Sequence, residues 1–289
     1  MSAESKKTAV VTGASTGIGL GCVKVLAAGG WRVFAAVRRS EDAERLTKAF
    51  GEAVRPLLFD VTDVDAVARA AREVGEALGG RTLSGLVNNA GVAVAGPLLH
   101  LKIADFERQI AVNLSGPLIV TQAFAPLLGA DRSRSGPPGR IVMMSSVGGL
   151  TAAPFLGPYS ASKFALEGLS ESLRRELMLY GIDVVVINPG AVATPIWGKS
   201  DDIDAEFAAT PYASAIAKVK AYMVAMAEAG LPPERIGEAV RTALTAERPK
   251  TRYIVTPTPV QDFLARNLPK RWVDGMIASR LGLAPPKRG

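Results

Sequence analysis

Residues 8–28 read TAVVTGASTGIGLGCVKVLAA, and this stretch decides the fold class. A short apolar run, Thr8–Thr12, leads directly into a glycine-rich turn, and residues at helical spacing follow over Gly17–Ala28. Glycine lets the backbone turn sharply, because it adopts positive φ angles at little steric cost. We therefore predict a buried strand, a tight turn and a helix in immediate succession, which is typical of α/β proteins.

The glycines of this turn follow the pattern G-x-x-x-G-x-G, formed by Gly13, Gly17 and Gly19. The stricter G-x-G-x-x-G pattern is absent, because Cys22 stands where its third glycine would fall. Such a turn lets a pyrophosphate approach the backbone, and the N-terminus of the following helix stabilises its charge. Its position between a strand and a helix predicts a dinucleotide-binding site.

The rest of the chain alternates between apolar runs of strand length and longer stretches at helical spacing. The further predicted strands are Arg32–Val37, Val54–Phe59, Leu83–Val87, Arg140–Ser145, Asp183–Ile187 and Arg252–Thr256. The further predicted helices are Asp42–Phe50, Asp63–Leu78, Ile103–Leu128, Tyr159–Tyr180 and Pro232–Ala246. Strands without polar alternation are buried on both faces, which favours a parallel sheet. We predict an α/β fold in which residues 1–289 form a single doubly wound Rossmann domain, with a seven-stranded parallel sheet and helices on both faces.

The composition excludes several classes of protein. The chain has 289 residues, 48% of them hydrophobic, and a net charge of +7, which is typical of globular rather than disordered or fibrous chains. A single cysteine and a single histidine exclude an internal disulfide and a Cys/His metal site, and they favour the reducing cytoplasm. The uncharged stretches 109–130 and 141–162 are interrupted by Gly, Ser or Pro, so we predict no transmembrane segment.

The positive charge is concentrated near the C-terminus. From Arg266 onward there are six basic residues and one acidic residue, Asp274. The basic segment 259–289 also contains apolar residues, which are Phe263, Leu264, Leu268, Trp272, Val273, Met276 and Ile277. One interpretation is a solvated end that packs on the domain, and the alternative is peripheral contact with an anionic membrane. We expect no nucleic-acid partner.

The end of the second predicted strand bears on the choice of cofactor. It reads Ala36-Val37-Arg38-Arg39, and the first acidic residue after it is Glu41. An acid at this position binds the ribose 2′-hydroxyl of NAD, whereas arginine accommodates the 2′-phosphate of NADP. We therefore predict NADP(H) rather than NAD(H), with Arg38 on the phosphate and Ser15 assisting it.

Tyr159 and Lys163 lie four residues apart at the start of a predicted helix, so they share one face. A tyrosine with its ordinary pKa of about 10 is a weak acid–base catalyst near neutral pH. An adjacent ammonium group and the positive charge of an oxidised nicotinamide would favour the phenolate and lower that pKa. The pair is therefore a candidate for proton transfer.

Polar residues at the ends of other predicted strands accompany this pair. Ser146, preceded by Ser145, lies thirteen residues before Tyr159, and Asn88–Gly91 ends the fourth strand. Because ligands bind beyond the carboxyl ends of parallel strands, a hydroxyl there can hydrogen-bond a substrate carbonyl. Asn113 interrupts an apolar helix, where its amide is costly unless it is hydrogen-bonded.

Together these motifs resemble the short-chain dehydrogenase/reductase family in its single-domain form. The likeness covers about residues 8–195 and rests on Thr12–Gly19, Asn88–Gly91, Asn113, Ser146, Tyr159, Lys163, Asn188-Pro189-Gly190 and Thr194. It implies that Tyr159 is the general acid–base and that Lys163 lowers its pKa and holds the nicotinamide ribose. It also implies that Ser146 orients the carbonyl and that Asn113 positions a water in a proton relay. The cofactor contacts that it implies are Gly13, Ser15, Thr16, Gly17, Ile18, Gly19, Arg38, Asp60, Val61, Asn89, Ala90, Gly91, Tyr159, Lys163, Pro189, Gly190 and Thr194.

The predicted function is interconversion of a carbonyl and an alcohol by an NADP(H)-dependent oxidoreductase, with Tyr159 supplying the proton for oxygen. The alternative is a non-catalytic dinucleotide-binding regulator or scaffold with the same fold. The region 196–230 is expected to cover the substrate, and its apolar residues favour a lipophilic one; they are Ile196, Trp197, Phe207, Tyr212, Ile216, Val219, Met223 and Met226. Residues 159–197 look most like the branch that acts on steroids and retinoids.

Three further expectations concern packing. The apolar residues of 159–180 predict pairing with the 103–128 helix of another subunit, in a homodimer or homotetramer, as is common in the family. Cys22 is expected in the core. His100 is expected at the surface, where it would open the helix that follows Gly96-Pro97.

Overall fold

Seven parallel strands form one sheet in the computed structural model, which describes residues 6–194 and 203–283. The strands are β1 (Thr8–Val11), β2 (Arg32–Val37), β3 (Val54–Leu58), β4 (Gly85–Asn88), β5 (Arg140–Met144), β6 (Asp183–Pro189) and β7 (Arg252–Val255). Their spatial order is β3-β2-β1-β4-β5-β6-β7, and every neighbouring pair is parallel. The chain therefore winds from β1 toward one edge and then toward the other, which confirms the predicted doubly wound sheet.

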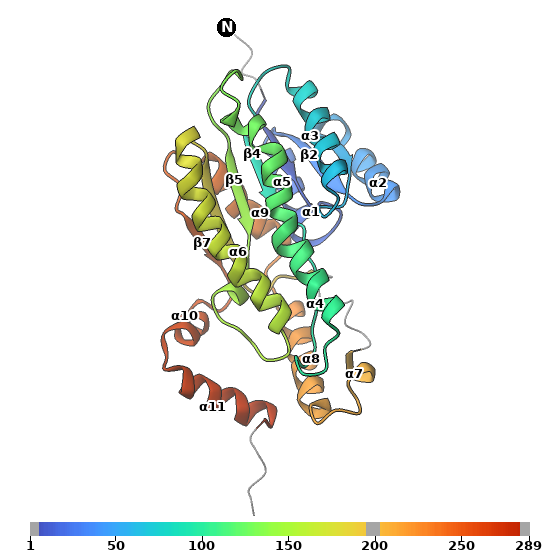
Figure 1. The fold of residues 1–289 in the computed structure, drawn as a ribbon, viewed down its shortest axis with the longest axis vertical. Helices are drawn as coiled ribbons and strands as arrows, with labels where there is room; N and C mark the ends of the chain where they lie inside the picture. The colour runs from blue at the N-terminus through green and yellow to red at the C-terminus, as the bar shows by residue number, and fades with distance from the viewer. Residues whose placement is uncertain (1–5, 195–202, 284–289) are drawn as a thin grey trace, which may run out of the picture.

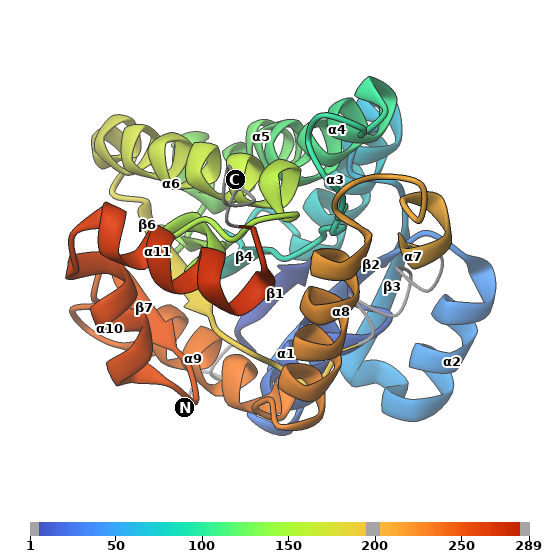
Figure 2. The same cartoon turned by 90° about the horizontal axis from the view of Figure 1, so that it is seen from below.

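Helices cover both faces of this sheet (Figure 1, Figure 2). One layer consists of α1 (Gly17–Ala28), α2 (Ser40–Phe50) and α9 (Pro233–Thr245). The other consists of α3 (Val64–Leu78), α4 (Ile103–Ile110), α5 (Gly116–Phe124) and α6 (Gly157–Glu176). An apolar core lies on each face of the sheet, between the strands and the helices that cover that face. Alternate residues of one strand point into opposite cores. In β1, for example, Val10 packs into one core while Ala9 and Val11 pack into the other.

Four more helices lie at the end of the molecule where the strands terminate. They are α7 (Ile203–Glu206), α8 (Ala213–Glu228), α10 (Pro259–Asn267) and α11 (Lys270–Leu281). Figure 2 looks onto this end and shows α8 and α11 in front of the sheet. A small third core joins α7, α8 and α11 to the loop before α6; its buried members are Phe155, Phe207, Ala215 and Ile216. These elements therefore border the carboxyl ends of the strands, where a ligand would bind.

The segment 103–128, which the sequence predicts as one helix, is helical throughout and contains two π-type turns. After α4 the backbone forms a wide turn of π type at Ala111–Ser115, and a second one follows α5 at Pro126–Ala130. Pro117 and Pro126 have no backbone N–H, so the regular hydrogen-bond ladder cannot run through them. At Gly129 the φ angle is +116°, and the helical path ends. The predicted helix over 103–128 is therefore confirmed, and the two π-type turns within it were not predicted.

Smaller differences concern element ends. The fourth strand begins at Gly85 rather than Leu83, because the Leu83 N–H donates to the carbonyl of Leu127 at 2.7 Å. His100 is exposed as expected, but it lies in a turn before α4 and does not open that helix. The last turn of 159–180 is a 3₁₀ helix, Leu177–Tyr180.

Within residues 6–194 and 203–283, no helix has the length and apolar content needed to span a bilayer. Ile196 and Trp197, which belong to the expected lid, and residues 284–289 of the basic segment lie outside the described residues.

Candidate active site

The turn between β1 and α1 is shaped for close approach of a phosphate. Gly13 and Gly17 have φ angles of +63° and +53°, which side-chain-bearing residues rarely adopt. A Cβ on Gly19 would lie 2.1 Å from the carbonyl oxygen of Gly13, so only glycine fits there. Within the described chain, the first turn of α1 has neither a side-chain cap nor an acidic residue. Its backbone N–H groups are therefore available to an anion.

The end of β4 holds this turn in place. The amide Nδ2 of Asn89 donates to the carbonyl oxygens of Thr12, at 2.8 Å, and Gly13, at 3.3 Å. In return the hydroxyl of Thr12 accepts the backbone N–H groups of Asn89 and Ala90 at 2.9 and 3.0 Å. These contacts fix the predicted cofactor residues of β1 and β4 as one unit.

Arginines gather at the end of β2, beside the same turn. The exposed Arg38 lies 3.7 Å from the carboxylate of Asp60. Arg45, on α2, donates to the backbone carbonyl of Ser15 at 2.7 Å and to Asp42 at 2.8 Å. Sequence reasoning missed Arg45, because its place beside Ser15 depends on how α2 packs. Two guanidinium groups thus border the position expected for a 2′-phosphate.

Asp60 and Val61 follow β3 at the same edge of the sheet. Burial raises the pKa of the Asp60 carboxyl, but hydrogen bonds from Thr62 and the charge of Arg38 outweigh it, so the pKa lies below its ordinary value. The side chain is therefore ionised at neutral pH and keeps Arg38 close. Val61 is buried against Gly116, where a Cβ would lie 2.7 Å from its Cγ2.

Tyr159, Lys163 and Ser146 converge where β5 ends and α6 begins. Lys163 donates from Nζ to the carbonyl oxygen of Met144 at 2.8 Å, and the same Nζ lies 5.8 Å from the centre of the Tyr159 ring. The Ser146 hydroxyl accepts the N–H of Gly148 at 3.0 Å and hydrogen-bonds the phenol of Tyr159. Gly148 lies against the same ring, since a Cβ there would be 3.2 Å from Cε1. Ser146, not Ser145, therefore faces the tyrosine.

Burial governs the protonation of this cluster. It raises the pKa of Tyr159 above its ordinary value, and the hydrogen bond with Ser146 only partly opposes that effect. It also lowers the pKa of Lys163 to about 8, against the opposing charge of Glu167. The sequence predicted a tyrosine pKa below the ordinary value. In the protein alone desolvation is the larger effect, because both groups are almost completely buried.

Asn113 is a buried, hydrogen-bonded amide at the first π-type turn. Its Nδ2 donates to the carbonyl of Val92 at 3.0 Å and to the hydroxyl of Ser162 at 3.2 Å, and its Oδ1 accepts the N–H of Val92 at 2.9 Å. Ser162 in turn donates to the carbonyl of Tyr159 at 2.7 Å. Asn113 thus links the loop after β4 to the start of α6.

A second polar network lies behind the cluster. Glu167, one helical turn beyond Lys163, accepts hydrogen bonds from Asn188 at 2.6 Å and from Arg252 at 2.5 Å. Asn188 also donates to the carbonyl of Ser146 at 2.9 Å. Sequence reasoning missed Glu167 and Arg252. Glu167 could have been found from the sequence, because an acidic residue one helical turn after Lys163 on a buried helix face indicates a polar interaction.

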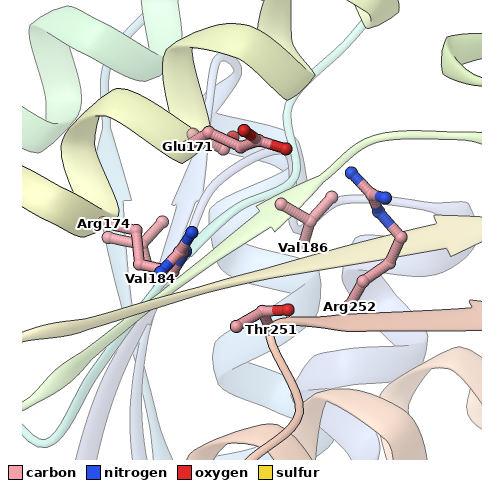
Figure 3. Close-up of a pocket in the computed structure, with 7 residues that line it drawn as sticks. Glu171, Arg174, Val184, Val186, Thr251 and Arg252 are labelled. Carbon is pink, nitrogen blue, oxygen red and sulfur yellow. The ribbon is translucent and has the colours of Figure 1, made fainter.

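Arg252 also lines a small pocket between α6 and the strands β6 and β7 (Figure 3). Its other lining residues are Ser170, Glu171, Arg174, Val184, Val186 and Thr251. None of them is a predicted site residue, so this pocket is distinct from the cluster around Tyr159.

The remaining predicted residues are placed as follows. Pro189 ends β6 and is buried, and a Cβ on Gly190 would lie 2.3 Å from Oγ1 of Thr256. Thr194 is half-buried, at the last described position before the gap. Cys22 is buried, and burial raises the pKa of its thiol to about 12, so it is unreactive core.

A glycine-rich turn before a helix, a doubly wound sheet and a tyrosine–lysine–serine cluster at its carboxyl edge are together typical of a dinucleotide-dependent oxidoreductase. The family model described as short chain dehydrogenase matches residues 7–204, and the chain belongs to that family. It is an NAD(P)-dependent oxidoreductase of the short-chain dehydrogenase/reductase type.

Individual relatives agree with this assignment. The chain is 39% identical to an NADPH-dependent 3-dehydrocapnine reductase of Ornithobacterium rhinotracheale, over 92% of this chain and 94% of that protein. Among solved structures, it resembles a short-chain dehydrogenase from Streptomyces avermitilis, with a TM-score of 0.75, 25% identity and coverage of 97% and 98% of the two chains. It also resembles a metagenomic short-chain oxidoreductase in complex with NADP, with a TM-score of 0.67, 29% identity and coverage of 87% and 97%.

Proposed function

We propose that this protein uses NADP(H) to interconvert a carbonyl and an alcohol on a lipophilic substrate, with Tyr159 as the general acid–base. The observation that carries the proposal is the convergence of Tyr159, Ser146 and Lys163 at the edge of the sheet that also holds the β1–α1 turn. The chain acts as one dinucleotide-binding domain, with 196–230 as its substrate lid.

The backbone N–H groups and arginine side chains around the β1–α1 turn are suited to binding the phosphates of NADP(H). The turn at Gly13–Gly19 and the N-terminus of α1 would hold the pyrophosphate, and Arg38 with Ser15 and Arg45 would bind the 2′-phosphate. Asp60 and Val61 would flank the adenine. The nicotinamide end would be held by Asn89, Ala90, Gly91, Tyr159, Lys163, Pro189, Gly190 and Thr194. An NADPH-dependent relative and an NADP-bound structural neighbour support this choice.

Each catalytic side chain has a distinct task. The bound nicotinamide supplies or accepts the hydride. Ser146 donates a hydrogen bond to the substrate oxygen and stabilises the charge that develops there. Tyr159 gives its phenolic proton to that oxygen during reduction and takes it back during oxidation. The Lys163 ammonium stabilises the resulting phenolate, and Asn113 holds a water that carries the replacement proton.

The apolar core beside the site supports a lipophilic substrate. Phe155 precedes α6, and its ring packs edge-on against Tyr212 of the lid, with the ring centres 5.7 Å apart. Phe207 and Ile216 are buried in the same cluster. A substrate that binds beside such residues would be of the steroid, retinoid or fatty type rather than a polar carbonyl compound.

We also propose a homodimer or homotetramer in the cytoplasm, in which α6 and the α4–α5 segment face another subunit. Phe164 on α6 is 46% exposed, which supports a further apolar contact there.

The test is a screen of NADPH oxidation across aldehydes, ketones, quinones and steroid ketones. We expect turnover of apolar carbonyl compounds, and higher kcat/KM with NADPH than with NADH. Binding of NADPH with no turnover of any class would instead indicate the alternative, a dinucleotide-binding regulator or scaffold. A preference for NADH would contradict the cofactor assignment.

A further inference from the structure

The two C-terminal helices, α10 and α11, expose large apolar side chains to solvent. Neither helix contains a fully buried residue. Val260, Phe263 and Leu264 of α10 are 71%, 57% and 45% exposed, and Trp272 and Met276 of α11 are 67% and 52% exposed. We call these five residues the apolar face of the C-terminal helices.

The orientation of α10 is the reverse of that of an ordinary surface helix. Val260, Phe263 and Leu264 share one side at helical spacing and face solvent, whereas Asp262 and Arg266 are half-buried. A surface helix normally turns its apolar stripe toward the core and its polar residues outward. The stripe of α10 therefore has no partner in the part of the chain that the structure describes.

Helix α11 carries two apolar stripes. Val273, Ile277 and Leu281 are half-buried and face the domain, where Leu281 packs against the third core beside the lid. Trp272 and Met276 lie four residues apart on another side and face solvent. The half-buried stripe already packs α11 against the domain, so the exposure of Trp272 and Met276 needs a different explanation.

Unpaired cations accompany the apolar face. Lys270, Arg271 and Arg280 are exposed, and none of them forms an ion pair with any residue in the described ranges. The exposed acid of α11 is Asp274. Trp and Phe beside unpaired Lys and Arg are the side chains by which interfacial helices bind anionic membranes.

We propose that α10 and α11 dock the protein on an anionic lipid surface. The apolar face enters the boundary between headgroups and acyl chains, while Lys270, Arg271 and Arg280 contact lipid phosphates. A second copy of this chain fits less well. A two-fold symmetric contact sets each patch against itself, so it would bring like charges together.

The position of α10 and α11 has a consequence for substrate entry, which rests on the proposed function. Both helices lie at the end of the molecule where the strands terminate, and α11 contacts the lid helix α8 (Figure 1, Figure 2). A lipid surface held there would place the substrate entrance beside the bilayer. A lipophilic carbonyl compound could then pass from membrane to site without crossing water.

The experiment is sedimentation of the full chain with vesicles of phosphatidylcholine alone or mixed with phosphatidylglycerol. We expect binding only to the anionic vesicles, and release at about 1 M salt, where the screening length falls to about 3 Å. Phe263→Ser with Trp272→Ser should weaken binding, and so should Lys270→Glu with Arg271→Glu, each by about ten-fold or more. Trp272 fluorescence, taken as the difference between the native protein and Trp272→Phe, should shift to the blue on binding.

Two control pairs lie on other parts of the surface. Leu58→Ser with Val64→Ser removes apolar groups that are 57% and 59% exposed, and Arg69→Glu with Arg72→Glu reverses two exposed charges on α3. Both should bind vesicles like the native protein. All four paired variants should turn over a water-soluble carbonyl normally, which separates docking from catalysis. The proposal is overturned if the native protein stays in the supernatant with anionic vesicles, or if the α10–α11 variants bind normally. It is also overturned if those variants only convert a dimer to a monomer in light scattering.

Discussion

The carboxylate of Glu167 accepts a hydrogen bond of 2.6 Å from the amide of Asn188, which joins helix α6 to strand β6. Asn188 donates also to the carbonyl of Ser146, so the same amide fixes the turn that carries the serine hydroxyl. Glu167 has a further effect through space, because its negative charge raises the pKa of Lys163 against the effect of burial. One side chain thereby influences both the position of Ser146 and the protonation of Lys163.

Replacing Glu167 should therefore change the pH dependence of the reaction. Lys163, with a pKa of about 8, loses its proton as the pH rises through that value. Glu167→Gln removes the charge that raises this pKa, so the pKa should fall further and the ammonium should be lost at lower pH. We expect the alkaline limb of the kcat/KM profile to move to lower pH. We also expect the free energy of unfolding to fall by about 1–3 kcal/mol, because Arg252 loses its partner.

Glu171→Gln is the matched control for this variant. Glu171 lies on the same helix one turn later and pairs with Arg175, but both side chains are about half exposed. That variant should keep the native pH profile, since exposed pairs contribute little. An unchanged alkaline limb in Glu167→Gln would show that Glu167 has only a structural role.

The sequence was sufficient to predict the sheet because its signal is local. Buried parallel strands are continuous apolar runs, and all seven were found within two residues of their observed ends. The turn at Gly13–Gly19 could likewise be predicted, because positive φ angles and close contacts need glycine. The two π-type turns within 103–128 were not predicted, because they depend on prolines and on the contact of Asn113 with the distant Val92.

Features of the candidate site that arise from tertiary packing could not be predicted from the sequence. Arg45 touches Ser15 only because α2 folds back over the first turn. Arg252 meets Glu167 across 85 residues of sequence, between β7 and α6. The direction of the Tyr159 pKa also depends on burial, which a spacing of four residues does not reveal. Residue identity was enough to propose the members of the candidate site, while tertiary contacts determine their electrostatics.

Gly19 offers a test of the phosphate turn. Gly19→Ala places a Cβ 2.1 Å from the carbonyl oxygen of Gly13, so the turn must move. We expect NADPH binding, followed by fluorescence titration, to weaken by about ten-fold or more, and stability to fall by about 1–3 kcal/mol. Gly29→Ala is the control, because a Cβ at the other end of α1 meets nothing closer than 3.4 Å. Equal NADPH affinity in the two variants would contradict the assignment of this turn.

Arg38 and Arg45 should together determine the preference for NADP(H). Arg38→Ala removes the guanidinium beside Asp60, and Arg45→Ala removes the one that donates to Ser15. Each change should raise KM for NADPH by about ten-fold while KM for NADH changes little. Arg69→Ala, which removes an exposed arginine on α3, should leave both constants unchanged. If Arg45→Ala behaved like Arg69→Ala while Arg38→Ala lost NADPH, Arg45 would have no part in phosphate binding.

Tyr159 is the residue on which the proposed chemistry depends most directly. Tyr159→Phe keeps the ring that packs against Gly148 but removes the proton donor, so kcat should fall by about a thousand-fold. NADPH affinity should stay within about three-fold, because the phosphate contacts that we propose at Gly13–Gly19 and Arg38 are untouched. Tyr180→Phe, at the far end of the same helical segment, removes a hydroxyl outside the site and should leave kcat unchanged. A Tyr159→Phe variant with near-native turnover would mean that another group supplies the proton.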